Sequence, residues 1–471
     1  MRNEPLTLVN LGIIKFSYQK NLLLLLTYYQ DFQNFLDLHM IFPLINYAES
    51  LHNVYKPEDL LQAKMELLDF TNMVDYQIKL WTAKHSSSQS PPVEMTERRQ
   101  TVVRDLQILM EEAKPLLNVV QDSALLQDLK GSGKFNLLHL ETNYEVTTAV
   151  LESFFAYGKF QYECGDYEKA HTILSLYRDL DSEERSERSF DALWGKLTCE
   201  ILMIVAEWEA NKAILALDDL KELARILNAR DSDPLHPPNH LEQLQFRRWM
   251  LHWSLFVFFH QSDGRSQIVD FFMGDKISKE NLRHRNVLEN HCQWLLRYVA
   301  AAVISNKNRK SHHLRDLVSI VEQEKQYYSD PITQLLECLF SNFDFEKALQ
   351  TLKRCERVLR IDYFLAGLKQ DFVDNARALI FETHCRLNSS IDISLLCNKL
   401  GMTPDDAEKW IVDLVRTAKL DAKIDLESNS VVMGASQLLV WQDVADKTKD
   451  LAIKTFTLTS GIINMQQEGV L

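Results

Sequence analysis

The chain has 471 residues and a formal net charge of −14, from 52 lysines and arginines against 66 aspartates and glutamates. This length suffices for two or three packed units, each with its own core. An acidic chain repels the phosphate backbone of nucleic acids unless its basic residues gather on one face. No run of clustered lysines and arginines occurs, so the composition argues against nucleic-acid binding by the whole chain and leaves a local contact open.

Residue usage favours long helices in a reducing compartment. Only 13 glycines and 11 prolines occur, so few positions break helices, and the 46% hydrophobic and 25% charged shares are those of an ordinary globular protein. The seven cysteines are odd in number, widely spaced and contain no C-x-x-C pair, which argues against a zinc ribbon or a thioredoxin-type site. Buried thiols in the cytosol or nucleus fit this usage.

The N-terminal segment contains a run of five leucines, Leu22–Leu26. A membrane span needs about 20 apolar residues. A secretory signal is disfavoured because Lys15 and Lys20 interrupt the apolar stretch. We therefore expect a helix that is buried or faces a partner, with no membrane contact.

Apolar residues after Thr101 follow a helical period. Their spacings alternate between four and three, which places them on one stripe of a helix. They are Val102, Leu106, Leu109, Ala113, Leu116 and Val120. Proline removes a backbone donor from a helix interior, so Pro115 is expected to kink this helix or to end its first half.

A weak internal repeat runs through the middle of the chain. Residues 165–170 (GDYEKA) recur as residues 343–348 (FDFEKA). In both copies an aromatic residue starts a helix and an alanine follows one turn later, as in the helical hairpins of tetratricopeptide-like repeats. Because the copies are few and uneven, the sequence predicts an irregular, mainly α-helical solenoid.

One helix is expected to be buried on every side. Residues 245–259 (QFRRWMLHWSLFVFF) are apolar nearly all round beyond Trp249, so either their own domain or a partner must cover them. The candidate partner-facing residues are Trp253, Phe256 and Phe259. We expect Trp253 and Phe256 to be covered at least in part by a neighbouring segment or another protein of a complex.

The hydrophobic period changes after residue 387. Residues 391–393 suggest a short strand, and residues 394–400 suggest a short helix. Thr403 and Pro404 are a favourable N-cap and first position for a second helix. This second helix is followed by residues 420–424, which alternate between apolar and polar side chains as a half-buried strand does.

The partner strand is predicted at residues 431–433. A helix, a turn, a helix and a two-stranded hairpin make a winged helix. Its predicted core consists of Ile393, Leu396, Leu400, Trp410, Ile411, Leu414, Ile424 and Val432.

The winged helix is expected to pack against protein and to make minor or no contact with nucleic acid. Its second helix is nearly neutral and its hairpin is acidic, whereas a recognition helix presents several arginines or lysines. The residues around His312 and His313 leave two alternatives open. Together with Lys307, Arg309 and Lys310, they form either a solvated helix start or a small basic patch that touches ribosomal RNA.

A search for catalytic, cofactor and metal sites yields no candidate residues. Residues 131–134 (GSGK) superficially resemble a phosphate loop, but Asp128 stands at the position of its first glycine and Phe135 replaces the serine or threonine. His236 and His240 flank two prolines, so no helix aligns them as zinc ligands. The sequence therefore predicts a protein that is not an enzyme.

Several segments resemble segments of one protein family. They are residues 35–44 (FLD…FPL), 71–75 (TNMVD), 159–165 (KFQYECG), 193–197 (LWGKL), 252–259 (HWSLFVFF), 402–404 (MTP), 410–412 (WIV), 420–425 (LDAKID) and 431–433 (VVM). A helical solenoid that ends in a winged helix resembles the PCI family. Within it, these segments resemble the family of the e subunit of eukaryotic translation initiation factor 3. Residues 1–28 and the end beyond residue 450 depart from the family.

The resemblance implies a scaffold subunit of initiation factor 3 in the cytoplasm, with some nuclear presence left open. It implies support for binding the small ribosomal subunit and recruiting messenger RNA, and a C-terminal helix that joins a bundle. The implied partners are other subunits of the factor, the small ribosomal subunit through the complex, and the scaffold factor that brings capped messenger RNA. The alternative in the same architecture is a subunit of the proteasome lid or the signalosome.

The same resemblance divides the chain. The expected parts are a divergent extension at 1–28, an N-terminal helical region at 29–130, a helical-repeat solenoid at 131–387, a winged helix at 388–436 and a C-terminal helical tail at 437–471.

Overall fold

The computed structural model describes most of the chain in segments. They are residues 35–51, 54–85, 90–181, 187–207, 210–231, 239–261, 263–274, 279–306, 311–388, 390–392, 422–425, 430–433 and 437–467, with single positions at 409, 412 and 416. The chain forms two compact units, Met1–Ser341 with Thr351–Val373, and Asn342–Gln350 with Asp374–Leu471. Among the described helices, none is both long and apolar enough to cross a membrane.

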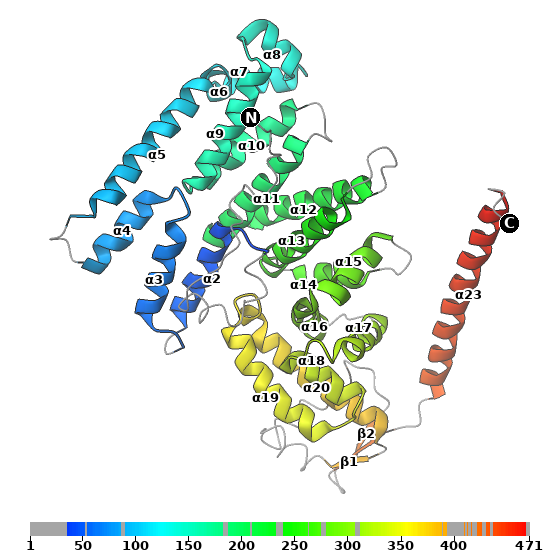
Figure 1. Ribbon diagram of the computed structural model, residues 1–471. Coiled ribbons are helices and arrows are strands. Elements are labelled where there is room, and N and C mark those ends of the chain that lie inside the picture. Colours follow the sequence, from blue (N-terminus) through cyan, green and yellow to red (C-terminus); the bar gives the residue numbers. More distant parts are fainter. Residues whose placement is uncertain are drawn as a thin grey trace. The chain divides into compact units, whose positions relative to one another are not determined.

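The first unit is built from helices (Figure 1). They are α2 (Leu38–Ser50), α3 (Pro57–Leu68), α4 (Val74–His85), α5 (Val93–Glu112), α6 (Lys114–Gln121), α7 (Ser123–Gly131), α8 (Leu137–Tyr144), α9 (Thr148–Glu163), α10 (Tyr167–Leu180), α11 (Glu187–Glu207), α12 (Ala210–Asp231), α13 (His240–Phe259), α14 (Gly264–Met273), α15 (Lys279–His291), η2 (Gln293–Leu295), α16 (Leu296–Ser305), α17 (Ser311–Glu324), α18 (Pro331–Phe340) and η3 (Ala366–Leu368). Two further helices, α19 (Phe345–Ile361) and α20 (Lys369–Leu387), contribute residues to both units.

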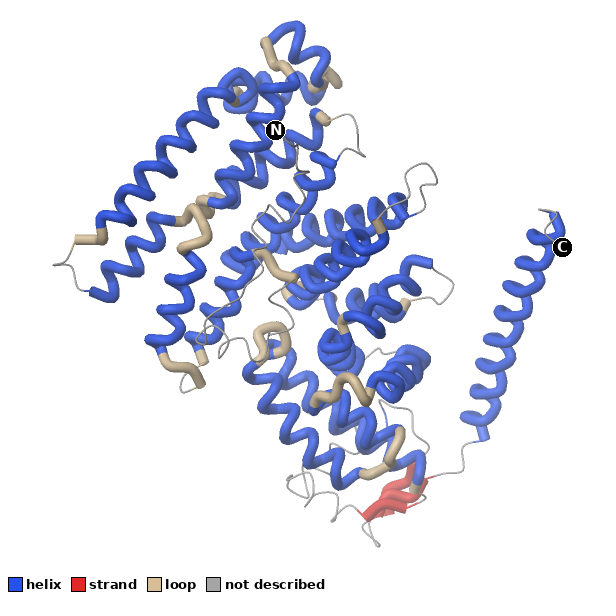
Figure 2. Tube along the Cα trace, viewed as in Figure 1, coloured by secondary structure: helices blue, strands red, loops and turns tan. Residues whose placement is uncertain are grey.

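Consecutive helices of the first unit pack against one another, which confirms the predicted solenoid. Helix α9 packs on α10, α10 on α11, α11 on α12, and α12 on α13. The two helices α10 and α11 approach closely because Gly195 lacks a side chain. A Cβ atom at this position would lie 2.9 Å from Cδ1 of Leu174. Figure 2 shows that helices dominate the described residues and that strands are confined to a small sheet.

The predicted break at Pro115 is present. Helix α5 ends at Glu112, and α6 begins at Lys114 with Pro115 in its first turn. The N–H groups of a first turn have no acceptor within the helix, so the N–H that proline lacks costs no hydrogen bond there. On the predicted stripe, Ala113 and Leu116 are fully buried. The two helices therefore share one apolar side across the break.

The internal repeat corresponds to two helix starts with the same local geometry. Asp166 caps α10 by accepting a hydrogen bond from the backbone N of Lys169, and Asp344 accepts one from Lys347 at the start of α19. The alanines one turn later, Ala170 and Ala348, are fully buried. The residue before each aspartate has a left-handed backbone conformation, with φ of 88° at Gly165 and 52° at Phe343.

Replacing Phe343 by glycine is expected to raise the free energy of unfolding by about 0.5–1 kcal/mol. A left-handed conformation costs a residue with a Cβ atom roughly 1–2 kcal/mol, and glycine removes this cost. The greater freedom of glycine in the unfolded chain offsets part of the resulting gain in stability. The Phe343 side chain is 49% exposed, so little packing is lost. Urea unfolding of the purified chain measures the change. Phe343→Ala keeps the Cβ atom and should give no gain, and a glycine variant less stable than the alanine variant would contradict the account.

The second unit contains a three-stranded antiparallel sheet and a long helix. The strands are β1 (Ser390–Asp392), β2 (Ala422–Asp425) and β3 (Ser430–Met433), in the order β1-β3-β2. Val431 is fully buried and pairs with Ile391 on one side and Ile424 on the other. The helix is α23 (Gln437–Gln467).

Strands β1, β2 and β3 overlap the strands predicted at residues 391–393, 420–424 and 431–433, of which residues 393, 420 and 421 lie outside the described residues. Six of its predicted core residues lie outside the described residues, namely Ile393, Leu396, Leu400, Trp410, Ile411 and Leu414. The strand register pairs Val432 with Ser390 and Lys423. Ile424 instead pairs with Val431, which the sequence-based core did not include and which is buried. The membership of the helical part of this core stays a prediction.

Candidate functional site

Residues 249–258 of helix α13 are buried inside the chain itself. Trp253 is 3% exposed and Phe256 is 1% exposed, while Phe259 is half-buried. The indole Nε1 of Trp253 donates a hydrogen bond of 2.9 Å to the carbonyl of Phe35. The ring of Phe256 meets Phe364 edge-on at 4.8 Å. We expected either a segment of the same chain or a partner protein to cover this helix. A segment of the same chain covers Trp253 and Phe256, so their assignment as partner-facing residues was wrong.

The segment that covers α13 is anchored by a buried carboxylate at the start of α2. Asp37 is the N-cap of α2 and accepts a hydrogen bond of 2.9 Å from the backbone N of His39. It also accepts a hydrogen bond from the hydroxyl of Tyr162 on α9. Burial first, and the Asp37 charge second, raise the pKa of Tyr162 well above its ordinary value, so this hydroxyl stays a donor.

Neighbouring residues add polar and aromatic contacts to the same anchor. Nδ1 of His39 lies 2.9 Å from the hydroxyl of Tyr167, and burial lowers the pKa of this histidine, which keeps it neutral. The ring of Phe35 stacks on His252 at 4.5 Å. On α13, the guanidinium of Arg248 lies 4.3 Å from the same ring. These contacts join residues more than a hundred positions apart in sequence.

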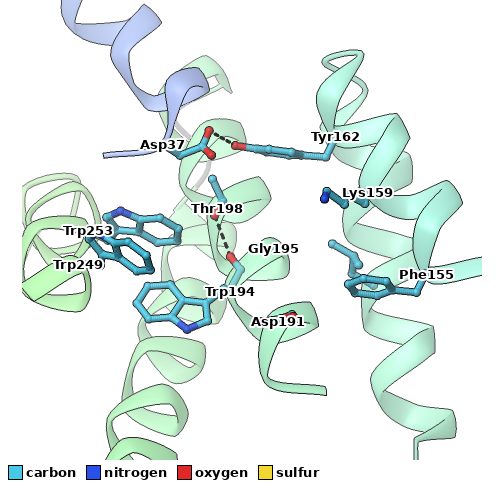
Figure 3. Close-up of a pocket in the computed structure, with 11 residues that line it drawn as sticks. Asp37, Phe155, Lys159, Tyr162, Asp191, Trp194, Gly195, Thr198, Trp249 and Trp253 are labelled. Carbon is cyan, nitrogen blue, oxygen red and sulfur yellow. Dashed lines mark hydrogen bonds between the residues drawn. The ribbon is translucent and has the colours of Figure 1, made fainter. Parts of the chain in front are cut away.

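A small cavity lies below this anchor, between α9, α11 and α13 (Figure 3). Its volume is about 30 Å³, room for roughly two water molecules and too little for an organic substrate. Tryptophans 194, 249 and 253 line it together with Phe155, and Asp191 and Lys159 border it. Burial raises the pKa of Asp191 to about 6, against the opposing charge of Arg188. The cavity is a small gap in the packing between these helices.

The candidate metal ligands and the candidate phosphate loop can be checked against the described residues. No group of three or more histidine, cysteine or acidic side chains is placed to hold a metal within the described segments. Gly131 is the last residue of α7 and residues 132–134 follow it, where the amide of Ser132 donates to the carbonyl of Asp128 and Gly133 has φ of 65°. A phosphate binds at a helix N-terminus, so this segment presents the wrong end of the helix.

Three of the histidines considered in the sequence, His240, His312 and His313, lie at the starts of two helices. His240 is the exposed first residue of α13, and His236 lies outside the described residues. His313 is 5% exposed and its ring contacts exposed His312 at 4.2 Å. The basic residues at 307, 309 and 310 lie outside the described part of the chain, so both interpretations of this patch stay open.

Helix α23 carries an exposed apolar stripe. Positions with alternating spacings of three and four share one side of the helix, namely Trp441, Val444, Thr448, Leu451, Thr455, Leu458 and Ile462. Trp441, Leu451 and Leu458 are each more than 60% exposed. The hydroxyls of Thr448 and Thr455 bond to the carbonyls one turn earlier, so both threonines can enter an apolar interface with their polar groups satisfied.

A second, shorter stripe lies roughly 120° away around the axis of α23. It consists of Ile453, Phe456 and Ile463, of which Phe456 is 73% exposed. A helix with two separate apolar stripes is suited to packing between two neighbouring helices.

Comparison with known proteins assigns the chain to a family. Residues 29–161 match the eIF3 subunit 6 N terminal domain, and residues 352–435 match the PCI domain. The E subunit of eukaryotic translation initiation factor 3 from Arabidopsis thaliana is 37% identical over 92% of this chain and 95% of its own length. The protein of the same name from Bombyx mori is 37% identical over 90% and 92%, and that from Aspergillus oryzae is 36% identical over 91% of each. The chain belongs to this family of initiation factor 3 E subunits.

The family assignment confirms the resemblance seen in the sequence. The PCI match includes the three strands of the sheet and the predicted core residue Trp410. The N-terminal match begins at residue 29, and the divergent extension expected at 1–28 stays a prediction. Sequence reasoning missed the Asp37–Tyr162 anchor, since the two residues lie 125 positions apart and no local period connects them.

Proposed function

We propose that the chain is a non-catalytic scaffold subunit of an initiation factor 3 complex in the cytoplasm. In this role it supports binding of the small ribosomal subunit and recruitment of messenger RNA when protein synthesis begins. The observation that carries the proposal is the similarity to initiation factor 3 E subunits over nine-tenths of both chains. Its partners are the other subunits of the factor and, through the complex, the small ribosomal subunit and the scaffold factor that brings capped messenger RNA.

The two stripes on α23 support assembly with other helices. Full burial of a leucine side chain contributes roughly 1.5–3 kcal/mol, and the long stripe offers Leu451, Leu458 and Ile462 together with Trp441. These side chains are exposed on α23, so a partner that covers them gains the free energy of their burial. A bundle of C-terminal helices from neighbouring subunits would cover both stripes.

Replacing Leu458 by glutamate is expected to reduce recovery of the chain with other initiation factor 3 subunits at least tenfold. The variant loses apolar burial and places a charge in the proposed interface, and about 1.4 kcal/mol already corresponds to a tenfold change in binding. Affinity purification of the tagged full chain from cytosolic lysate, followed by quantitative mass spectrometry, measures the recovery.

The matched control is Thr457→Glu, which adds the same charge at the adjacent position. Thr457 is exposed and lies about 100° away from Leu458 around the helix. It should leave recovery within about twofold of the parent chain, since surface substitutions usually change free energies by less than about 0.5 kcal/mol. Equal recovery of both variants would contradict an interface on this stripe.

A further inference from the structure

A second surface feature of the first unit is an open groove. The groove has a volume of about 490 Å³ and lies where the end of α5 meets α6, the start of α7 and the end of α8. These helices follow one another at one end of the unit (Figure 1). The volume falls in the range of ligand pockets, roughly 300–1,000 Å³.

The lining of the groove combines an apolar floor with an acidic rim. The floor contains Pro115, Val119, Leu125 and Tyr144, of which Val119 is buried and the other three are half-buried. The rim carries three carboxylates, from Glu111, Asp122 and Glu145. An apolar floor inside a charged rim favours a ligand that has both apolar and charged groups.

Two of the three carboxylates are available to a ligand. Nζ of Lys114 lies 3.0 Å from Glu111 and balances its charge. Asp122 caps α7 through one oxygen only, because Oδ1 accepts the bonds from Ala124 and Leu125 at 3.1 Å each. Asp122 and Glu145 are exposed and form no ion pair among the residues that the structure describes.

Glu145 occupies a backbone conformation that disfavours glutamate. Its φ is 56°, in the left-handed region, at the C-cap of α8. Glycine and asparagine are the residues that adopt this conformation readily. Asparagine at this position would therefore keep the backbone conformation while it removes the charge.

We propose that this groove binds a short basic segment of a partner protein. Lysine or arginine side chains of the segment pair with Asp122 and Glu145, and an apolar side chain lies on the floor formed by Val119 and Leu125. The rim charge excludes a nucleic-acid ligand, since its carboxylates repel phosphates. The proposal concerns a surface on α5–α8 and is independent of the interface on α23 and of membership in initiation factor 3.

The test uses the purified full chain and two labelled peptides, one of alternating arginine and leucine and one of alternating glutamate and leucine. Fluorescence anisotropy should show binding of the arginine peptide that weakens as salt is added, and no binding of the glutamate peptide. The double variant Asp122→Asn with Glu145→Asn should bind the arginine peptide about five- to tenfold more weakly. Asparagine keeps the N-cap of α7 and suits the left-handed position, so this variant should fold.

The matched control removes the same two charges elsewhere on the same helices. Asp128→Asn on α7 with Glu141→Gln on α8 changes exposed residues that do not line the groove, and it should bind the arginine peptide as the parent chain does. The proposal is overturned if the control weakens binding as much as the groove variant. It is also overturned if the groove variant binds normally, or if the parent chain does not bind the arginine peptide.

Discussion

Replacing Arg297 by alanine is expected to lower the free energy of unfolding by about 3–5 kcal/mol. Nη2 of Arg297 lies 2.6 Å from Oδ1 of Asp330, and Nη1 lies 3.6 Å from Asp362. Both carboxylates are nearly inaccessible, at 3% and 0% exposure. Removing the guanidinium leaves two buried negative charges without the cation that balances them, and this desolvation cost is the source of the loss.

The arginine connects three separate parts of the first unit. Arg297 is the second residue of α16, Asp330 is the N-cap of α18 in a capping box with Thr333, and Asp362 follows α19. Asp362 also accepts a hydrogen bond of 2.9 Å from Tyr298. Burial raises the pKa of Asp362, and the charge of Arg297 acts in the opposite direction. Loss of the arginine should therefore loosen all three attachments together.

Urea unfolding of the purified chain measures this change, and an exposed ion pair provides the comparison. Lys130 lies 2.6 Å from Asp179, with both side chains more than 40% exposed. Lys130→Ala should cost less than about 1 kcal/mol, because solvent screens the pair. If Lys130→Ala and Arg297→Ala lower the free energy of unfolding by similar amounts, the buried network contributes no more than an exposed ion pair, which would contradict the account.

Trp253→Ala is expected to lower the free energy of unfolding by about 3–5 kcal/mol as well. The substitution empties the space beside Trp194, whose ring meets that of Trp253 edge-on at 4.7 Å. It also removes the donor that holds the carbonyl of Phe35. The enlarged cavity would border the segment that leads into α2, so the N-terminal anchor should weaken with it.

The comparison for this variant is Trp441→Ala on α23. Trp441 is 69% exposed, and its replacement should change the stability of the isolated chain by less than about 0.5 kcal/mol. Limited proteolysis provides a second readout, since Trp253→Ala should accelerate cleavage just before α2, beside Phe35. An unchanged unfolding curve for Trp253→Ala would contradict the packing described for α13.

Local features of the fold could be predicted from the sequence. The break before Pro115 follows from the missing backbone donor of proline. The burial of residues 249–258 in α13 follows from an apolar surface on every side of this half of the helix. The strands near residues 391, 424 and 431 follow from alternation and turn residues. Each of these signals lies within a few residues of the feature it predicts.

Other features could not be predicted because they depend on distant residues. The periodicity of α13 requires a covering surface but does not identify it, and the covering residue Phe35 lies 218 positions from Trp253. A partner was therefore as consistent with the sequence as the chain's own N-terminal segment. The burial of Val431, which the sequence-based core did not include, depends on strand register, because a one-residue shift exchanges the two faces of a strand.

The groove between α5 and α8 has no signal in the sequence. Its lining comes from four helices, and the left-handed conformation of Glu145 is visible only in the structure. The anchored α2, the buried Arg297 network and the exposed α23 give the chain a packed body and an accessible apolar helix. This combination is suited to holding other subunits together.

The measurement that tests the central claim most directly is affinity purification of the tagged chain from cytosolic lysate, with gradient sedimentation and mass spectrometry of the proteins that migrate with it. The account predicts recovery with the other subunits of initiation factor 3, in fractions that include the small ribosomal subunit. Recovery with proteasome or signalosome particles, or migration of the chain alone, would contradict it.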